Sequence, residues 1–440
     1  MENLFEDEFG VIYNCQKKSI VNARKLTNTT IYTVKEGTEI IDRDCFSYSN
    51  LVEINIPDSV LLIEERAFSC CRRLQKINLG NGLLRVKRYA FEHTSNLSRI
   101  HFPKCLKQLD FGSLVRCSGK LVVSFDSENK YYTSDRHFVY TKDKTKITHV
   151  INSYLNKFVK IPNGVTEIGD RAFMQSYRVE SVELADSVIS IGKFAFDSCG
   201  TMKVIKLSEK LIQIGEGCFN YSRIREITIP AKVKKIGKNA FMECSNLISI
   251  KVDKENQHFK SVNHILYSKD LKNLIAYPVN IPHKKFKIPL SVSKIATGAF
   301  IGTFNLHEVK LNDNIEVIEE SAFSDCYYLC RIGWSNKLRR VKKYAFRNCA
   351  SLTSVRFPDT LEQIDEDAFA FCPSLKYVYL PENVTNIKKE AFLNYQDIKF
   401  KIHKENKNFV VKNNRIYEKR ENIHFSEFWF GGNFDPNAPF

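Results

Sequence analysis

Residues 229–247 read Ile-Pro-Ala-Lys-Val-Lys-Lys-Ile-Gly-Lys-Asn-Ala-Phe-Met-Glu-Cys-Ser-Asn-Leu, one nearly complete copy of a pattern that recurs along the chain. An Ala-Phe pair, or a close variant of it, recurs on both sides of this copy. The anchors are Phe46, Phe68, Phe91, Leu114, Phe173, Phe196, Phe219, Phe241, Phe300, Phe323, Phe346, Phe369 and Phe392. Successive anchors are 22 or 23 residues apart, except for two gaps of 59 residues. A fixed period of this size is the signature of a solenoid.

Each repeat has the same internal order of apolar residues. Around Phe68, Ile63 lies five residues earlier and Cys71 three residues later, and Leu74 and Ile77 follow at alternating positions. Alternation predicts short strands with one buried face, and no stretch keeps helical periodicity for three turns. We therefore predict one elongated, curved solenoid, mainly β with short turns or 3-10 pieces. It is a leucine-rich-repeat superhelix of 13 coils of about 23 residues, interrupted by β-hairpin modules.

The two long gaps each contain 36 added residues that align with each other. Residues 127–131 and 138–140 match residues 254–259 and 265–267, and partial copies occur at residues 11–13 and 404–417. The predicted organisation lists eight segments: 1–45 partial hairpin module and cap, 46–119 repeats, 120–160 hairpin module, 161–250 repeats, 251–287 hairpin module, 288–400 repeats, 401–424 hairpin module, and 425–440 aromatic tail or cap.

The repeat unit closely resembles the BspA-type leucine-rich repeat. Its consensus is Ile-Pro-x-x-Val-x-x-Ile-Gly-x-x-Ala-Phe-x-x-Cys-x-x-Leu, and residues 229–247 match it closely. The hairpin module at residues 253–278 also resembles the segment that interrupts those repeats in the family. The resemblance covers roughly residues 10–420. It implies a leucine-rich-repeat fold and a surface protein used in adhesion or binding of host proteins.

Composition indicates a folded protein attracted to acidic partners. The 440 residues are 43% hydrophobic and 26% charged, which is typical of globular proteins, and the net charge is +16. Apolar runs are too short for a transmembrane helix, and the acidic first residues do not match a signal peptide. The 13 cysteines are an odd number, and a reducing compartment is the simplest interpretation.

Sequence motifs give no support for an enzyme, a metal site or a cofactor. Seven cysteines occupy the position three residues after the anchor, which predicts a ladder of buried structural thiols: Cys71, Cys117, Cys199, Cys244, Cys326, Cys349 and Cys372. No zinc-ligand spacing, nucleophile elbow or phosphate-binding loop occurs. Paired carboxylates such as Glu319-Glu320 fall in the predicted exposed loop before the anchor, where no pocket is expected.

The predicted strand face supplies one set of candidate binding residues. Stacked strands present one outward residue per coil in columns, and aromatic and arginine side chains are enriched at binding hot spots. The candidates in these columns are Lys206, Lys251, Lys310, Arg331, Arg356, Tyr377 and Tyr379. An ordinary solvated sheet face is the alternative interpretation. Trp334 aligns with Leu311 and Phe357 and is predicted to be part of the core.

Lysine pairs before the anchors supply a second set. Lys234-Lys235, Lys342-Lys343 and Lys388-Lys389 have nearly the same phase, which predicts a basic stripe along one edge. The expected partner is another protein or an acidic macromolecule. Nucleic acid is disfavoured because the aromatic residues are buried anchors. The aromatic tail, residues 425–440, could cap the last coil or mediate docking or self-association, as could end-to-end stacking.

Two functions remain open on the sequence alone. The first, implied by the resemblance, is a cell-surface adhesion or host-binding protein. The second is an intracellular scaffold that docks an acidic assembly, which the cysteine count, the net charge and the acidic first residues favour. The compartment is left undecided.

Overall fold

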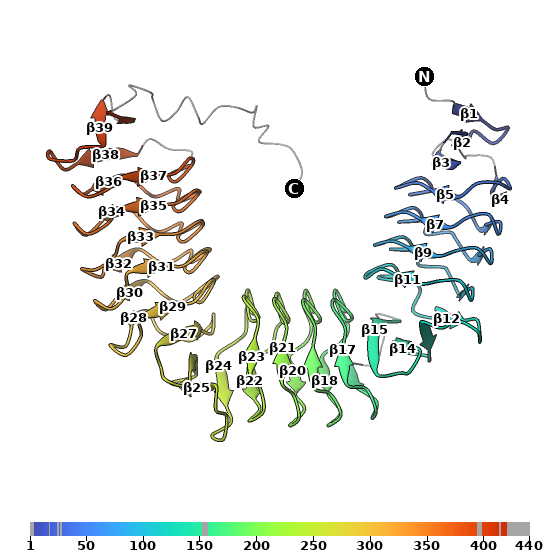
Figure 1. Ribbon diagram of the computed structural model, residues 1–440, viewed down its shortest axis with the longest axis horizontal. Coiled ribbons are helices and arrows are strands. Elements are labelled where there is room, and N and C mark those ends of the chain that lie inside the picture. The colour runs from blue at the N-terminus through green and yellow to red at the C-terminus, as the bar shows by residue number, and fades with distance from the viewer. Residues whose placement is uncertain are drawn as a thin grey trace. The chain divides into compact units, whose positions relative to one another are not determined.

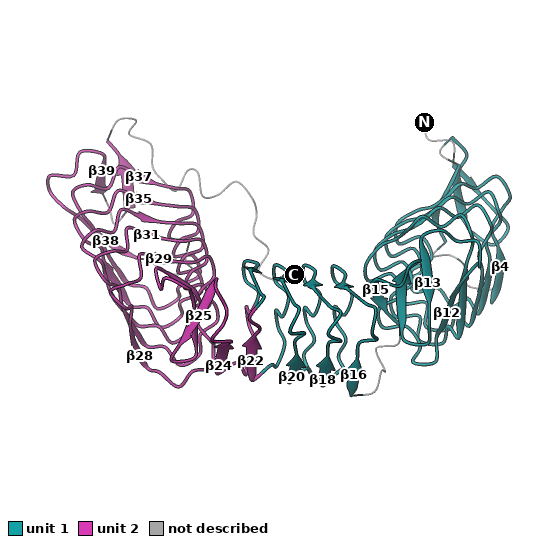
Figure 2. Cartoon of the chain, turned by 60° about the horizontal axis from the view of Figure 1, so that its bottom comes forward, with its two compact units in different colours: residues 1–224, 232–240 teal, residues 225–231, 241–440 magenta. Residues whose placement is uncertain are grey.

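The computed structural model describes residues 4–419, except 17, 24–25, 27–28, 152–156, 394–397 and 413–414. Within these ranges the chain forms strands and turns and no α-helix (Figure 1). It divides into two compact units. Unit 1 comprises residues 1–224 and 232–240, and unit 2 comprises residues 225–231 and 241–440 (Figure 2). The predicted aromatic tail, residues 425–440, lies outside the described residues.

Each coil contributes a first strand and a shorter second strand, and each set forms parallel ladders. In unit 1 the first strands are β4 (Ile31–Thr33), β6 (Glu53–Asn55), β8 (Lys76–Asn78), β10 (Arg99–Phe102), β12 (Val122–Phe125), β16 (Phe158–Lys160), β18 (Ser181–Glu183) and β20 (Val204–Lys206). The second strands are β5 (Ile40–Ile41), β7 (Leu62–Ile63), β9 (Arg85–Val86), β11 (Gln108–Leu109), β17 (Glu167–Ile168), β19 (Ser190–Ile191), β21 (Gln213–Ile214) and β23 (Lys235–Ile236).

Unit 2 repeats this arrangement. Its first strands are β22 (Glu226–Ile229), β24 (Ser249–Val252), β28 (Lys285–Lys287), β30 (Glu308–Lys310), β32 (Arg331–Gly333), β34 (Ser354–Arg356), β36 (Tyr377–Leu380) and β38 (Lys399–Ile402). Its second strands are β29 (Lys294–Ile295), β31 (Val317–Ile318), β33 (Arg340–Val341), β35 (Gln363–Ile364) and β37 (Asn386–Ile387).

The hairpin modules are antiparallel, and the first three of them continue into the second-strand ladders. They are β1 (Leu4–Glu6), β2 (Ile12–Asn14) and β3 (Ser19–Asn22); β13 (Tyr132–Ser134), β14 (Phe138–Thr141) and β15 (Lys146–Val150); β25 (Phe259–Val262), β26 (Ile265–Ser268) and β27 (Asn273–Ala276); and β39 (Phe409–Lys412) with β40 (Arg415–Glu418). The third strands β3, β15 and β27 pair in parallel with β5, β17 and β29.

The solenoid has about 16 turns instead of the predicted 13 coils. The anchors supply thirteen turns, and the third strands β3, β15 and β27 add three, because each occupies the place of a second strand in the ladder. The predicted fold class is confirmed. The difference arises because a module strand without an Ala-Phe anchor was not recognisable as part of a turn.

Phenylalanine anchors form the centre of the core. Phe300, Phe323 and Phe346 are fully buried, and their ring centroids follow one another at 4.7 and 5.2 Å in stacked geometry. The backbone N–H of each of these three Phe residues donates to the Ala carbonyl of the next coil, as from Phe323 to Ala345 at 2.8 Å. A small Ala allows this close approach, and stacked rings add to apolar burial. The Ala-Phe pair is therefore both a packing and a hydrogen-bonding unit.

Residues with left-handed backbone conformations lie two positions before and after the anchors. Around Phe68, Arg66 and Cys70 have φ angles of 58° and 59°, and around Phe323, Ser321 and Asp325 have 54° and 58°. A left-handed conformation costs a non-glycine residue roughly 1 kcal/mol or more. The two left-handed residues reverse the chain direction on either side of the anchor. These reversals close the coil and leave the anchor side chain pointing inward, which offsets the conformational cost.

A search of the described helices finds none that is both long and apolar enough to span a membrane.

Candidate functional site

The outward residues of the first strands of unit 2 include a group of cations. The middle residue of each strand, such as Val309 or Val355, points into the core, and its two neighbours point outward. We call the outward cations of β28, β30, β32, β34 and β38 the basic face. Its members are Lys285, Lys287, Lys310, Arg331, Arg356, Lys399 and Lys401.

A single carboxylate accompanies these seven cations on the same strands. The carboxylate of Glu308 lies between Lys285 and Arg331, at 3.2 and 3.9 Å from their side-chain nitrogens. Lys287, Lys310 and Lys401 form no ion pair with any described residue. Exposed ion pairs of this kind contribute little to stability. The excess positive charge is therefore available to a ligand.

Two tyrosines extend the basic face onto β36. Arg356 pairs with Tyr379 across the ladder and lies over its ring at 5.0 Å, and Lys399 lies 5.9 Å from the ring of Tyr377. Tyr377 is 55% exposed. Cation–π contacts of this length hold the side chains in place without neutralising their charge. The 23-residue repeat spacing also places Arg356 opposite Tyr379, as the ladder between β34 and β36 does.

The other predicted strand-face residues are already paired. Lys206 in unit 1 forms an ion pair with Glu183 at 3.1 Å. Lys251 in unit 2 forms one with Glu226 at 2.7 Å, which holds the pKa of that carboxyl below its ordinary value. These two lysines are consequently weaker candidates for a partner than the unpaired cations of the basic face.

The predicted basic stripe requires correction, because neighbouring coils alternate in charge. Lys342 pairs with Glu319 at 2.7 Å, and Lys343 pairs with Glu366 at 3.1 Å. Acidic residues therefore lie in the coils on both sides of this lysine pair. Lys388 and Lys389 occupy the same positions relative to their anchor as Lys342 and Lys343 do. The coil between these two lysine pairs carries Asp365 and Glu366 instead. The prediction compared the lysine pairs with one another and did not take the acidic residues of the coil between them into account. This edge therefore carries alternating positive and negative charges.

Lys234 and Lys235 lie apart from that ladder. They belong to unit 1, and Lys235 is in β23 beside Gln213 of β21. Relative to their own anchor they lie three positions earlier than Lys342 and Lys343 do. Neither forms an ion pair with a described residue.

Four cations of the basic face were missed by the sequence prediction. Lys285, Lys287, Lys399 and Lys401 flank Phe286 and Phe400, and both triplets read Lys-Phe-Lys. The first triplet was assigned to a hairpin module, and the second lies at the boundary of another. The sequence did contain evidence for this strand. Phe286 lies 23 residues before Val309, which is the repeat spacing and indicates that Phe286 is the buried strand residue of a regular coil.

A hollow of about 380 Å³ opens in the basic face between β32 and β34. Arg331 and Arg356 line it together with Ile332 and Trp334. Trp334 packs against the core, as predicted, but it is only half-buried, whereas Leu311 and Phe357 are buried. The expectation of a core tryptophan therefore holds only in part, because one side of the indole faces the hollow.

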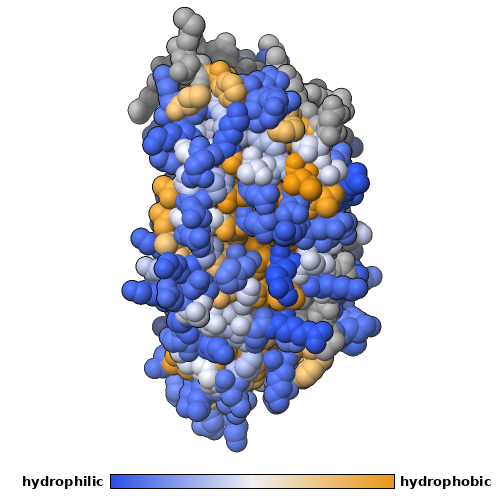
Figure 3. Space-filling model, turned by 90° about the vertical axis from the view of Figure 1, so that its right-hand side faces the viewer, coloured by the Kyte–Doolittle hydropathy of each residue, from blue (hydrophilic) through white to orange (hydrophobic). Residues whose placement is uncertain are grey.

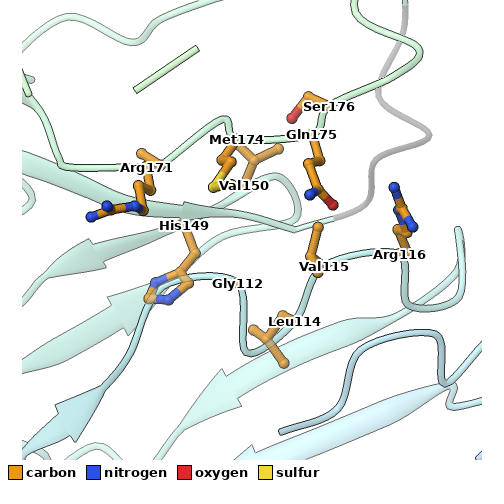
Figure 4. Close-up of a pocket in the computed structure, with 11 residues that line it drawn as sticks. Gly112, Leu114, Val115, Arg116, His149, Val150, Arg171, Met174, Gln175 and Ser176 are labelled. Carbon is orange, nitrogen blue, oxygen red and sulfur yellow. The ribbon is translucent and has the colours of Figure 1, made fainter. Parts of the chain in front are cut away.

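Unit 1 contains a much smaller pocket (Figure 4). Arg116 and Arg171 lie at opposite sides of it, and His149 projects from β15. Its volume of about 30 Å³ has room for roughly one water molecule. Burial lowers the pKa of His149, whose ring contacts the carbonyl of Asp110 at 2.9 Å. A pocket of this size is too small for an organic substrate.

The acidic residues do not form a catalytic arrangement with either hollow. Glu366, Asp367 and Glu390 have carboxylate oxygens within 4.8 Å of one another, and burial together with Glu390 raises the pKa of Asp367. Glu366 is engaged by Lys343, and no carboxylate lines either of the two hollows described here. These carboxylates lack the enclosed site that acid–base chemistry requires.

Hydrophilic residues predominate on the side of the molecule drawn in Figure 3, which is the right-hand side of Figure 1 and belongs to unit 1. Contiguous apolar patches mark many protein interfaces. In unit 2, the feature that marks the strand face is its set of seven cations with one carboxylate.

Comparison with protein families identifies the repeat. The model described as "BspA type Leucine rich repeat region (6 copies)" matches residues 39–154, 145–272 and 279–399. A comparison with curated proteins gives no match.

Three of the similar solved structures are leucine-rich proteins or antigens of bacteria. A leucine-rich cell surface protein of Faecalibacterium prausnitzii has 25% identity and a TM-score of 0.48, with 92% of this chain and 95% of that chain covered. The pneumococcal vaccine antigen PcpA has 18% identity and a TM-score of 0.48, with 94% and 91% covered. A leucine-rich repeat protein of Bacteroides ovatus has 19% identity and a TM-score of 0.36, with 92% and 98% covered.

Proposed function

Because the chain belongs to the BspA-type leucine-rich repeat family, we propose that it is a non-catalytic recognition protein whose basic face binds an acidic segment of another protein. The observation that carries this proposal is the ratio of seven cations to one carboxylate on six neighbouring strands of unit 2. Stacked coils repeat the positive charge at the strand spacing of about 4.8 Å. A flexible acidic polypeptide can follow such a row.

Electrostatics and side-chain type both support a protein partner. Oppositely charged surfaces accelerate association, and salt weakens it because the charges are exposed. Arginine and tyrosine, represented by Arg356 and Tyr377, are frequent binding hot spots. The two tyrosines are covered in part by cations, which leaves fewer free rings for base stacking. These features favour an acidic polypeptide over nucleic acid.

The test is titration of the full-length protein with fluorescein-labelled poly-L-glutamate at low and high salt. We expect the triple variant Lys287→Glu, Lys310→Glu and Arg356→Glu to reduce affinity about tenfold or more. The matched control is Lys232→Glu, Lys234→Glu and Lys235→Glu, which changes net charge equally but away from the basic face. Equal losses in the two variants would show that only overall charge matters and would contradict the proposal.

The identity of the acidic partner is tested in the same assay. Heparin and single-stranded DNA serve as an acidic glycan and a nucleic acid of comparable charge density. Preference for poly-L-glutamate, lost in the basic-face variant, supports a polypeptide partner. Basic-face binding of heparin or DNA that exceeds poly-L-glutamate binding would assign the face to that class instead.

The family and its surface-type members also support a role in adhesion or host-protein binding. A scaffold inside the cell is the competing proposal, favoured by the odd number of cysteines and by the positive net charge. Antibody labelling of intact and permeabilised source cells separates them. Labelling of intact cells supports the surface role, and labelling only after permeabilisation rules it out and supports the scaffold.

A further inference from the structure

Two neighbouring first strands of unit 2 do not pair, although the 23-residue repeat spacing continues through them. We call this unpaired position the missing rung. The sheet β28-β30-β32 ends at β32, the sheet β34-β36-β38 begins at β34, and the two strands share no ladder hydrogen bonds. No hairpin module separates them, because Phe323, Phe346 and Phe369 follow at 23-residue steps. The other interruptions of the first-strand ladder within unit 2 coincide with a module. The missing rung therefore has a local cause.

The neighbouring parts of the same coils remain tightly joined. The second strands β33 and β35 pair through Arg340 and Gln363, and Phe346 and Phe369 stack with centroids 5.0 Å apart. The backbone N–H of Ser351 still donates to the carbonyl of Tyr327 at 3.0 Å. The opening is consequently confined to the first strands, where the rest of the fold holds it in place.

Trp334 explains why the strands separate. It occupies the column of Leu311 and Phe357, and its ring lies 5.6 Å from Phe346 and 5.3 Å from Phe357. An indole is larger than either neighbouring side chain, and coils about 4.8 Å apart leave little room for it. The strands part, and Ile332 is left half-buried although its equivalents Val309 and Val355 are buried.

The hollow has the chemistry of a site for a peptide strand. Its two edges are strand backbones without ladder partners, and buried or partly buried backbone groups are normally hydrogen-bonded. Its floor is formed by Ile332 and Trp334. Its volume of about 380 Å³ falls within the range of roughly 300–1,000 Å³ for ligand sites. Main-chain bonding at a free strand edge, with side chains in alternating pockets, is an established mode of peptide binding.

The positive charge beside the hollow favours a peptide with acidic side chains. Arg331 and Arg356 flank the hollow, and the nearest carboxylate to Arg331 is Glu308 at 3.9 Å. Arg356 contacts Tyr379 and forms no ion pair with a described residue. Arginine binds carboxylates through directional paired hydrogen bonds. Acidic residues would meet the arginines, and apolar residues at alternate positions would meet Trp334.

We propose that the opening between β32 and β34 binds an extended segment of a partner protein in which acidic and apolar residues alternate, and that the segment lies along the opening and pairs with the free backbone edge of one of these two strands. This inference rests on the proposed function, because it specifies how the acidic partner engages the basic face. It adds that backbone hydrogen bonding, and not charge alone, contributes to recognition.

The test uses two synthetic peptides with the same side chains. One is acetyl-Glu-Val-Glu-Val-Glu-Val-amide, and the other carries N-methylated valines, which cannot donate backbone hydrogen bonds. The full-length protein carries Trp429→Phe, so that Trp334 is the single tryptophan. We expect the first peptide to change Trp334 emission in a saturable manner, and we expect the methylated peptide to bind about tenfold more weakly or worse. Equal binding of the two peptides would overturn the strand-addition proposal.

A variant that restores the ladder gives the second readout. Trp334→Leu introduces the residue found at Leu311, where the strands on both sides are paired. We expect this variant to lose anisotropy-detected binding of the fluorescein-labelled alternating peptide and to retain poly-L-glutamate binding. Retention of both would overturn the inference while the proposed function stands. If the protein without substitutions does not bind poly-L-glutamate, the proposed function itself is contradicted.

A second copy of the chain is the alternative occupant. Sedimentation velocity without peptide tests it directly. A dimer that is abolished by Trp334→Leu would place another copy in the opening and overturn the partner-peptide proposal.

Discussion

At the scale of single residues, the cysteine ladder is a hydrogen-bonding device. The thiol of Cys349 donates to the carbonyl of Phe323 in the preceding coil at 3.3 Å, and Cys326 and Cys372 make the same contact to their preceding anchors at 3.2 Å. The thiol is small, apolar and a weak donor. It therefore fills the turn and also contacts a buried carbonyl.

Substitution of Cys349 separates these two roles. We expect Cys349→Ser to be more stable than Cys349→Ala, by about 1 kcal/mol, because the hydroxyl can donate to Phe323 and the methyl group cannot. Urea unfolding of the two variants measures the difference. Apolar packing alone predicts the opposite order, so a more stable alanine variant would contradict the hydrogen-bonding role.

Buried thiols also predict instability in alkali. Burial raises the pKa of Cys71 to about 11 and that of Cys326 and Cys372 to about 12, above the value of about 8.5 for a free thiol. The neutral thiol is therefore favoured in the folded state. Its contribution is complete below pH 8.5 and is lost progressively as the pH rises toward 12.

We expect the free energy of unfolding to fall by up to about 1.4 kcal/mol per buried thiol for each pH unit within that window. Buried tyrosines such as Tyr267, whose pKa burial raises to about 12, act in the same direction. Thermal melts between pH 8 and 10.5 measure the slope. The double variant Cys326→Ser, Cys372→Ser should have a shallower slope, and an unchanged slope would assign the effect to the tyrosines.

At the scale of structural elements, buried asparagines fasten each hairpin module to the preceding coil. The amide of Asn256 donates to the carbonyl of Pro230 at 2.8 Å and accepts the backbone N–H groups of His258 and Phe259. Asn129 and Asn406 make the same contacts in their modules. This geometry explains why Glu-Asn is the part of the module that aligns best between copies.

We expect Asn256→Asp to destabilise the protein by about 2–4 kcal/mol. A carboxylate has no donor for the carbonyl of Pro230, and the substitution places a negative charge at a buried position. Gln257→Glu makes the same chemical change at the adjacent exposed residue and serves as the control. Chemical denaturation of both variants tests the assignment, which equal stabilities would refute.

The sequence predicted those elements whose pattern repeats. Spacing of the Ala-Phe pairs sufficed to place Arg356 beside Tyr379, because register follows from a constant period. It could not place Lys287 or Lys401, because their coils border modules. It also overlooked the ion pairs between Lys342 and Glu319, which depend on residues one coil apart. The opening at Trp334 depends on side-chain volume, which a pattern of apolar positions does not record.

At the scale of the whole chain, the thirteen thiols fall into classes of accessibility. Cys15 and Cys330 are exposed, Cys70 and Cys105 are intermediate, and the other nine are buried. The reactivity of a thiol is governed by its exposure and by its pKa, which burial raises at Cys71, Cys326 and Cys372.

We therefore expect a thiol-specific chromogenic disulfide reagent to modify two cysteines rapidly at pH 8, two more slowly, and the remaining nine only after unfolding in denaturant. Absorbance of the released thiolate measures all three phases. Variants Cys15→Ser and Cys330→Ser should each remove one equivalent from the fast phase. More than four reactive thiols in the native protein would show that the coils open far more readily than their packing implies.

The missing rung between β32 and β34 has a mechanical consequence. When a solenoid is pulled along its stacking direction, each pair of neighbouring coils carries the same force. The coils therefore separate first at the pair that is joined by the fewest hydrogen bonds. Within the run of coils from β28 to β38, that rung lacks its first-strand bonds and relies on β33, β35 and the anchor rings. A pulling force applied to the two ends of this run should therefore separate the coils of Phe346 and Phe369 before any other neighbouring coils of the run.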